Sequence, residues 1–513
     1  MFSQVFSAAT YGVSAYLVQV ETHLDTGMPK FFMVGLPDNA VKESIHRVTA
    51  AIKNSDFWFP NRRMTVNLAP ADIKKEGSSY DLPVAIGILV ASGQLVSEAL
   101  NQFILLGELA LDGSLRPVHG ALVIAAEAKL KGKRGIILPE ENAKEAAMVD
   151  GIEVYPMRSL RESVEYFAGE YRLLQPFQVN ISDVFSAEQN YSTDFADVKG
   201  QESVKRAMEV AASGGHNILL IGPPGSGKTM LAKRLPTILP PMTFDEALET
   251  TKIHSVAGML PPNVALISTR PFRAPHHTIS DSALVGGGTI PRPGEISLSH
   301  HGVLFLDELP EFARNVLEVL RQPLEDNKVT ISRSKMSVDY PSNFMLVCAM
   351  NPCPCGNYGS QTQECTCTPL QVQKYVGKIS GPLLDRIDIH VEVPTVQFQS
   401  LASKKVSEGS KDIRKRVVNA RTIQAERFRN RKGLYSNADM ESKEIKEFCN
   451  IDQNGSDLLK LAMNRLGLSA RAYDRILKVA RTIADLSNSD QIQTEHLSEA
   501  IQYRSLDRNF YTT

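Results

Sequence analysis

Eight residues from Gly222 to Thr229 carry the strongest chemical signal in the chain. They fit the pattern G-x-x-x-x-G-K-[ST], in which flexible glycines let backbone N–H groups point at phosphate oxygens. Lys228 would reach the β- and γ-phosphates, and the Thr229 hydroxyl would bind Mg²⁺. The sequence therefore predicts a site for a nucleoside triphosphate, taken to be ATP, and Mg²⁺, built from Gly222, Pro223, Pro224, Gly225, Ser226, Gly227, Lys228 and Thr229.

Two adjacent carboxylates, Asp307 and Glu308, follow the apolar run 303–306, which is typical of a buried strand. The carboxyl end of such a strand is where ligands bind in open α/β sheets. Asp307 would hold Mg²⁺ directly or through water, and Glu308 would act as general base on the attacking water. An apolar run ending in Asp-Glu is common by itself, but its place downstream of a phosphate-binding loop favours the catalytic interpretation.

A polar amide, Asn351, ends the next apolar run, residues 344–350. There it would hydrogen-bond the γ-phosphate or the attacking water. A turn-forming asparagine before Pro352 is the alternative interpretation. The order of loop, Asp-Glu strand and polar-ended strand favours the catalytic role.

The phosphate-binding loop needs a strand before it and a helix after it, and the flanking residues predict both. Residues 217–221 are short and mostly apolar, as in a buried parallel strand, and residues 230–235 are typical of a helix start. Further strand-like runs recur up to residue 395, which predicts a parallel sheet with crossover helices. The expected fold class is α/β.

Length and composition suggest about three domains in an ordinary globular protein, since 43 % of the 513 residues are apolar and 22 % charged. We predict an α/β N-terminal domain over 1–170, a linker over 171–195, the nucleotide-binding domain over 196–397 and a C-terminal helical domain over 398–513. No apolar run approaches the roughly 20 residues that span a bilayer, and no secretory signal precedes the first block. We therefore expect a cytoplasmic protein with no membrane partner.

Four of the six cysteines lie close together, as Cys353-Pro-Cys355 and Cys365-Thr-Cys367. Four thiolates suit a tetrahedral, structural Zn²⁺ site, although C-x-C is tighter than the usual C-x₂₋₄-C spacing. Free thiols are the alternative. We predict a zinc loop over 353–367, directly after Asn351.

Together these features resemble the AAA+ ATPases. The resemblance makes Asn351 the sensor 1 residue, Arg386 in the segment 381–388 the arginine finger, and Arg471 at the start of a C-terminal helix the sensor 2 residue. A finger acts in trans on the γ-phosphate of a neighbouring subunit, so the resemblance implies a ring, usually a homo-hexamer. An exposed salt bridge is the alternative for either arginine.

Within the AAA+ ATPases the chain is most similar to the YifB/ComM proteins of the magnesium-chelatase-like branch. The runs 273–278 (RAPHHT), 293–302 (PGEISLSHHG) and 351–356 (NPCPCG) carry this similarity. It implies a competence-associated helicase that drives branch migration while transforming DNA is integrated. The doubled histidines are expected to shape an insertion beside a ring pore, with no catalytic role.

DNA contacts would have to come from local patches, because the formal net charge is −1. Residues 328–340 predict a hairpin that carries Arg333 and Lys335 and resembles the pore hairpin of MCM helicases. The glycine-rich stretch 286–293 predicts a second pore loop with Arg292. One cation per subunit, repeated around a ring, would track phosphates; a solvated surface hairpin is the alternative.

The first block resembles the proteolytic domain of Lon, with Ser79 in the place of the nucleophile. Leu122 stands where the catalytic lysine should be, and a serine without its base is not activated. Because of this resemblance, an ATP-dependent protease is one alternative function. A chelatase-like motor that acts on a protein partner is the other.

Overall fold

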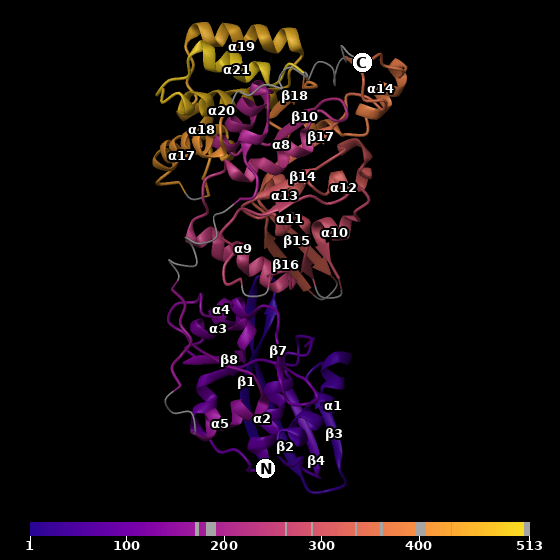
Figure 1. Cartoon of the computed structure of the whole chain (residues 1–513), viewed down its shortest axis with the longest axis vertical. Helices are drawn as coiled ribbons and strands as arrows, with labels where there is room; N and C mark the ends of the chain where they lie inside the picture. Colours follow the sequence, from indigo (N-terminus) through magenta and orange to yellow (C-terminus); the bar gives the residue numbers. More distant parts are fainter. Residues whose placement is uncertain are drawn as a thin grey trace. The chain divides into compact units, whose positions relative to one another are not determined.

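A computed structural model describes residues 1–169, 174–180, 191–261, 264–288, 291–333, 336–359, 363–396, 407–431 and 433–506. The chain divides into two compact units (Figure 1). Unit 1 comprises Met1–Glu188 and Phe244–Ser268, and unit 2 comprises Gln189–Thr243 and Thr269–Thr513. The segment Phe244–Ser268, which falls within the predicted block 196–397 in the sequence, belongs to unit 1.

Unit 1 is built on a seven-stranded sheet of order β3-β4-β2-β1-β5-β8-β9. β2 pairs antiparallel with β1 and β4, whereas the other neighbours are parallel. A separate two-stranded sheet pairs β6 (Glu108–Leu109) with β7 (Leu115–Arg116). The main strands are β1 (Phe2–Tyr11), β2 (Ser14–Asp25), β3 (Lys30–Val34), β4 (Arg63–Ala69), β5 (Phe103–Leu105), β8 (Gly135–Pro139) and β9 (Glu153–Met157).

Helices cover the two faces of this sheet unequally. One face packs with α1 (Asn39–Asn54), α2 (Asp81–Ala91) and α5 (Leu160–Ala168) in a large apolar core. On the other face, α3 (Ala121–Leu130) and α4 (Ala143–Ala146) share a smaller core with β5, β8 and β9, which also includes Ala8 of β1 and contacts Leu17 of β2. The second face is therefore covered over β5, β8 and β9 and over the adjoining parts of β1 and β2.

A helix from the middle of the sequence, α9 (Phe244–Ala257), completes unit 1. Its Ser255 hydroxyl bonds the buried Glu145 carboxylate of α4, which also accepts the Leu122 N–H at the start of α3. Burial raises the pKa of Glu145. Just after the helix, a Cβ on Gly258 would approach the His119 ring to 2.8 Å. α9 is thus held by close packing and by a buried polar contact.

Unit 2 contains a five-stranded sheet of order β11-β14-β17-β10-β18, and every neighbouring pair is parallel. Its strands are β11 (Phe272–Arg273), β14 (Val303–Leu306), β17 (Met345–Met350), β10 (Ile218–Ile221) and β18 (Ile389–Glu392). Because neighbouring strands are parallel, the chain must cross over between them; α8 (Lys228–Arg234) lies in the connection from β10 to β11, whereas α7 (Glu202–Gly214) precedes β10. The predicted α/β fold class with a parallel sheet is confirmed.

The C-terminal part of unit 2 is helical, as predicted. Val210 of α7, Val347 of β17 and Ile476 of α20 are buried in one apolar core, so this region packs on the sheet domain. The helices are α17 (Ser410–Arg427), α18 (Ser442–Phe448), α19 (Gln453–Leu466), α20 (Ala470–Leu486) and α21 (Thr494–Gln502).

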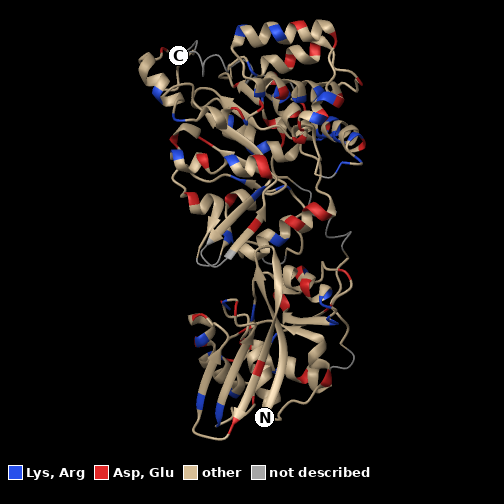
Figure 2. Ribbon diagram, turned by 180° about the vertical axis from the view of Figure 1, so that it is seen from behind, with Lys and Arg blue, Asp and Glu red and all other residues tan. Residues whose placement is uncertain are grey.

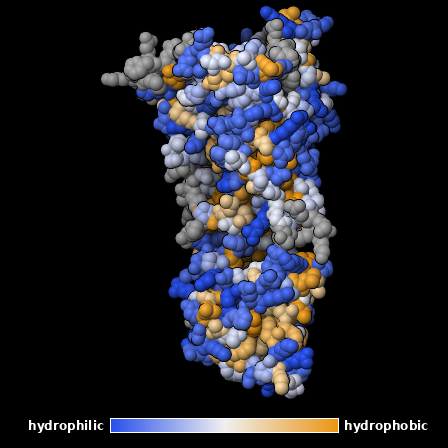
Figure 3. Space-filling model, turned by 90° about the vertical axis from the view of Figure 1, so that its right-hand side faces the viewer, coloured by the Kyte–Doolittle hydropathy of each residue, from blue (hydrophilic) through white to orange (hydrophobic). Residues whose placement is uncertain are grey.

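Acidic and basic residues are interspersed on both units (Figure 2). The surface is mainly hydrophilic, with apolar side chains gathered at places on the visible side of unit 1 (Figure 3). Among the described residues, no helix is both long and apolar enough to cross a membrane.

Candidate nucleotide site

The phosphate-binding loop follows β10 at the carboxyl edge of the parallel sheet. Gly225 and Gly227 adopt φ of +73° and +89°, a region that L-residues rarely enter. A Cβ on Gly222 would lie 2.3 Å from the Val393 carbonyl oxygen, so the loop runs directly against the chain that follows β18. α8 begins at Lys228, which leaves its first N–H groups directed toward the loop.

The Lys228 ammonium lies in the cradle that this loop forms. Its Nζ donates to the carbonyl oxygens of Gly222 (2.7 Å) and Pro223 (2.8 Å) and to Oδ1 of Asn351 (3.1 Å). Burial lowers the pKa of Lys228, against the opposing effect of the nearby Asp307 and Glu308 carboxylates. The structure thus brings the predicted sensor amide and the loop lysine into direct contact.

Thr229 and Asp307 meet on the other side of the loop. The Thr229 hydroxyl donates to Asp307 Oδ2 at 2.6 Å, so both predicted Mg²⁺ ligands converge from α8 and the end of β14. A hydroxyl and a carboxylate are the oxygen ligands that Mg²⁺ uses beside substrate phosphates. These residues fit a bound ATP–Mg²⁺ complex.

Glu308 follows Asp307 in a left-handed backbone conformation, with φ of +53°. This conformation is costly for a residue with a Cβ and turns the side chain away from the strand direction. Its carboxylate is 57 % exposed, and Oε2 lies 3.4 Å from Nδ1 of His277. His277 thus lies beside the predicted base, a contact that the sequence interpretation did not include, since it gave the doubled histidines no catalytic role.

The two predicted arginines occupy different surroundings. Arg386 is only 12 % exposed and pairs within its own chain with Glu325 of α13 (Arg321–Asp326), while it donates to the Pro382 carbonyl oxygen at 2.6 Å. Arg471 is 65 % exposed in the first turn of α20, with Asp385 3.9 Å away. Their roles toward phosphate stay predictions.

A buried polar cluster joins the sheet to the C-terminal helices close to these arginines. Asp388, just before β18, is paired with Arg475 of α20 and with Nδ1 of His216 at 3.1 Å. Nε2 of His216 lies 2.8 Å from the Thr482 hydroxyl, also on α20. Burial alone would raise the pKa of Asp388, but Arg475 and His216 outweigh it and hold this pKa well below its usual value.

We expect Asp388→Asn to destabilise the docking of the C-terminal helices by about 3 kcal/mol, because it leaves a partly buried arginine without its partner. The folded-state pKa of Asp388 is depressed, so its stabilisation is present above the unfolded value of about 3.9 and is lost as pH falls through the folded pKa. Urea unfolding followed between pH 7 and pH 3 checks this. The exposed Arg471→Ala is the control, with an expected change within about 0.5 kcal/mol. If the free energy of unfolding of Asp388→Asn differed from that of wild type by the same amount at all pH values, Asp388 would not be the group with the depressed pKa.

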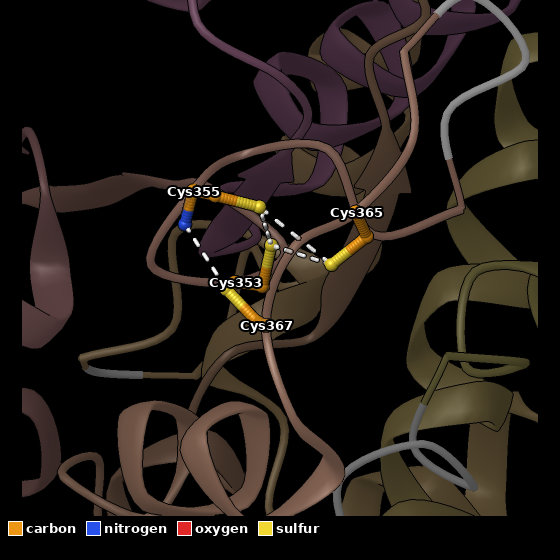
Figure 4. A group of neighbouring side chains, drawn as sticks. All are labelled: Cys353, Cys355, Cys365 and Cys367. Atoms are coloured by element: carbon orange, nitrogen blue, oxygen red, sulfur yellow. Dashed lines mark hydrogen bonds between the residues drawn. The ribbon is translucent and has the colours of Figure 1, made fainter.

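The four clustered cysteines converge on one point beyond Asn351 (Figure 4). Sγ of Cys353 lies 3.3 Å from Sγ of Cys355 and 3.7 Å from that of Cys365, and the four sulfurs lie within 4.8 Å of one another. A tetrahedral Zn²⁺ with bonds of about 2.3 Å separates its sulfurs by about 3.8 Å, so the cluster has the size of a zinc site. Backbone N–H groups, that of Asn357 first, lower the pKa of Cys355 to about 5. At Cys365 a backbone N–H acts in the same direction, but burial and the neighbouring sulfurs outweigh it and raise the pKa to about 12, so a metal would have to displace that proton.

Comparison with known proteins agrees with this geometry. Family models described as ChlI subunits of magnesium chelatase match residues 20–142, 194–401 and, for the C-terminal part, 407–504. The competence protein ComM of Haemophilus influenzae is 47 % identical over 98 % of this chain and 97 % of its own length. The protein YifB of Escherichia coli strain K12 is 44 % identical over 99 % and 97 %. The chain belongs to the magnesium-chelatase-like YifB/ComM family.

The magnesium-chelatase subunit ChlI of Cyanidium caldarium is a more distant relative, at 23 % identity over 47 % of this chain and 74 % of its own length. Membership of the YifB/ComM family, which is of the AAA+ type, indicates ATPase activity with ATP and Mg²⁺. The side chains that meet at the carboxyl edge of the sheet, Lys228, Thr229, Asp307 and Asn351, are compatible with these ligands.

We expect this YifB/ComM-family protein to carry about one zinc ion per chain after purification in reducing buffer. Cys365→Ser should lose the metal and lower the melting temperature, because an open site cannot hold the ion tetrahedrally. Elemental analysis and thermal melting with and without a chelator test this. The control is Cys449→Ala, a buried cysteine outside the cluster. Metal-free wild type that melts unchanged in chelator would rule out a zinc site.

Two β-hairpins project from unit 2 of this YifB/ComM-family chain. β15 (Lys328–Arg333) pairs with β16 (Met336–Pro341), and β12 (Gly286–Gly287) pairs with β13 (Arg292–Pro293). The Tyr340 hydroxyl donates to the Pro291 carbonyl oxygen at 2.7 Å, so the hairpins are joined. Arg292 is exposed, the Arg333 backbone ends β15, and Lys335 lies outside the described residues.

The protease-like features of unit 1 do not assemble into a serine–lysine pair. The Leu122 side chain is fully buried in α3, at the position where Lon would have its lysine. The buried Lys75 ammonium donates to the Ile73 carbonyl oxygen at 2.8 Å, and burial lowers the pKa of this lysine. The Ser79 carbonyl accepts from the Gly107 N–H, which fixes the backbone beside α2.

Proposed function

We propose that the protein is a subunit of a homo-hexameric ring that couples ATP hydrolysis to translocation on DNA, as a branch-migration helicase in the cytoplasm that aids integration of transforming DNA. One observation carries the proposal. The β15–β16 hairpin is inserted in the chain between β14, which ends at Asp307 and Glu308, and β17, which ends at Asn351. Hydrolysis of the γ-phosphate would therefore shift the ends of β14 and β17, the two strands between which the hairpin is inserted.

The joined hairpins support a DNA-contacting role. A Cβ on Gly286 would come within 2.6 Å of Ile331 Cδ1, so the base of one hairpin packs directly on the other. Movement of β15–β16 would then carry Arg292 with it. In a ring, one such cation per subunit together with Arg333 and Lys335 would contact successive phosphates without base specificity.

The catalytic residues are assigned by their contacts. Lys228, Thr229 and Asp307 would hold ATP and Mg²⁺, which neutralises charge on the transferred phosphoryl group. Glu308 would take the proton of the attacking water, and His277, 3.4 Å away, would orient the carboxylate. Asn351 would align the water through its amide.

The remaining two site residues would act across subunits or from the C-terminal helices. Arg386 would have to leave Glu325 to reach a neighbour's γ-phosphate, and Arg471 lies exposed at the N-terminal turn of α20. The role of Arg386 requires assembly, since it acts on a neighbour, whereas Arg471 would act from α20 of its own subunit.

A branch-migration assay on a synthetic four-way junction tests the proposal. Wild type with ATP should convert the junction into separate duplexes by branch migration. The Lys335→Ala variant should lack both this activity and the stimulation of ATP hydrolysis by DNA. The matched control is Lys328→Ala, a lysine at the base of the same hairpin that pairs with Asp339 at 3.1 Å. It should keep both activities. Unchanged junction processing by Lys335→Ala would refute the pore-hairpin assignment.

The same preparation separates the alternatives. ATP-dependent degradation of casein that Ser79→Ala abolishes would favour a protease. The similarity to ChlI subunits keeps a motor acting on a protein partner as the second candidate. ATPase activity that DNA does not change, with no retention on forked DNA, would favour that motor.

A further inference from the structure

One face of the sheet of unit 1 is open to solvent at the end of β1 and β2 that holds Phe2 and His23, whereas Ala8 and Leu17 further along the same face pack in the smaller core with α3. In the strands β3, β4, β2 and β1, side chains alternate between the large core and the opposite face. Val5, Val20 and Val66 point into the core and are fully buried. On the opposite face Phe2 is 62 % exposed, and His23 is exposed beside it. Such a solvated face of antiparallel strands normally carries polar residues.

Two phenylalanine rings and one imidazole ring instead lie on this face, in one row across the four strands that also contains Thr65. The strand register aligns Phe2 of β1 with His23 of β2, His23 with Thr65 of β4, and Thr65 with Phe32 of β3. Phe6 lies four residues further along β1, on the same face, opposite Gln19 of β2. With strands about 4.8 Å apart, the Phe2 and Phe32 positions are separated by roughly 14 Å.

Cations accompany these rings. Nζ of Lys30 and the guanidinium carbon of Arg63 lie 5.1 Å and 5.2 Å from the centroid of the Phe32 ring. Nζ of Lys133 lies 3.2 Å from the centroid of the Phe6 ring. Figure 2 shows basic residues as blue bands on strands of unit 1. The open face therefore combines aromatic rings with cations, both at the β3–β4 side near Phe32 and at the β1 side near Phe6.

The carboxylates of the same face are already engaged. Glu21 accepts from Nδ2 of Asn67 at 2.7 Å, and Asp25 accepts from the backbone N–H of Thr26 at 2.7 Å. Both lie in rows next to the aromatic row rather than in it. These hydrogen bonds come from neutral groups, so both carboxylates keep their charge. The three cations Lys30, Arg63 and Lys133 outnumber them, and an anionic ligand would meet these cations beside the rings.

We propose that this open face binds single-stranded DNA, with unpaired bases stacked on Phe2 and Phe32 and phosphates beside the three cations. Bases stack on aromatic side chains of a sheet only when they are unpaired, since a duplex buries the faces of its bases. The positive charge favours a polyanion over an apolar peptide. The surface is separate from the hairpins of unit 2, and its binding needs neither ATP nor a working motor.

The test uses the full chain without nucleotide and a fluorescein-labelled oligothymidylate, followed by fluorescence anisotropy. At the lower end of measured base–aromatic stacking, Phe32→Leu should weaken binding about fivefold, and Phe2→Leu with Phe32→Leu about 25-fold. Leucine keeps the apolar bulk but removes the ring. Phe32→Tyr restores the ring and should bind as wild type. Tyr435→Ala, an exposed aromatic of unit 2, should also bind as wild type.

Photocrosslinking to an oligonucleotide that contains 5-iodouracil locates the contact independently. Crosslinked peptides containing Phe2 or Phe32 would support the proposal, even if Lys335→Ala proved neutral and the motor function failed. Crosslinks confined to unit 2, or unchanged affinity of the double variant with an unaltered melting temperature, would overturn it. A change in sedimentation of the double variant without loss of DNA binding would overturn it in favour of contact with a second copy.

Discussion

Glu308→Gln should bind ATP–Mg²⁺ like wild type and hydrolyse it about 10² to 10⁴ times more slowly, the usual effect of removing a general base. Glutamine keeps the shape of the side chain but cannot accept the proton of the attacking water. The ligands Lys228, Thr229 and Asp307 do not change, and the hydrogen bond between Thr229 and Asp307 is intact. Phosphate release and the affinity for a fluorescent ATP analogue measure the two effects separately.

The matched control for this change is Glu311→Gln. Glu311 follows three residues later and pairs with Lys378 at 3.2 Å on the surface. It should leave the rate of hydrolysis unchanged. Equal losses in the two variants, or loss of ATP binding in Glu308→Gln, would contradict the assignment of Glu308 as the base.

Arg386→Ala should lower the rate of hydrolysis by about 10³-fold or more, because an arginine finger stabilises charge in the transition state. Mixing it with Glu308→Gln should restore part of the activity. In a mixed ring, an Arg386→Ala subunit still has Glu308, and a Glu308→Gln neighbour supplies the arginine that its site needs. A ring made of one variant alone has no site with both Glu308 and Arg386. Steady-state hydrolysis as a function of the mixing ratio measures the recovery.

The control for the second prediction is Glu325→Ala, which removes the intrachain partner of Arg386. It should retain activity, since the arginine is then free to reach the neighbouring subunit. If mixed rings stay inactive at every ratio, Arg386 acts within its own subunit or only on stability. Loss of activity in Glu325→Ala would indicate that the intrachain pair itself is needed.

Local signals made much of the site predictable. The loop Gly222–Thr229 combines glycines, a lysine and flanking apolar runs in a contiguous stretch, so its strand and helix could be recognised without knowing any distant contact. The C-terminal helix expected to start at Arg471 is α20 (Ala470–Leu486), whose apolar residues recur at helical spacing. The apolar residues between 82 and 95 favour a helix over that range, but α2 ends at Ala91. Gly93, with φ of +79°, ends it in a left-handed turn.

Contacts that depend on chain pairing could not be predicted. His277 comes near Glu308 because β11 pairs in parallel with β14, with Arg273 opposite Leu304. No pattern in the sequence fixes that register. The pair of Arg386 with Glu325 is likewise a contact between distant segments. The place of α9 in unit 1 depends on buried partners such as Glu145, more than a hundred residues earlier in the chain.

The crossing of α9 into unit 1 also sets the order in which the protein can fold during synthesis. Unit 1 is not finished when its first segment ends at Glu188, because α9 is made only after β10 and α8 of unit 2. A nascent chain that stops at Glu188 lacks the Ser255 hydroxyl that bonds the buried carboxylate of Glu145. The nucleotide-binding loop is therefore synthesised before α9 can pack in unit 1, and a fragment that ends at Glu188 would lack one of the segments of its own unit.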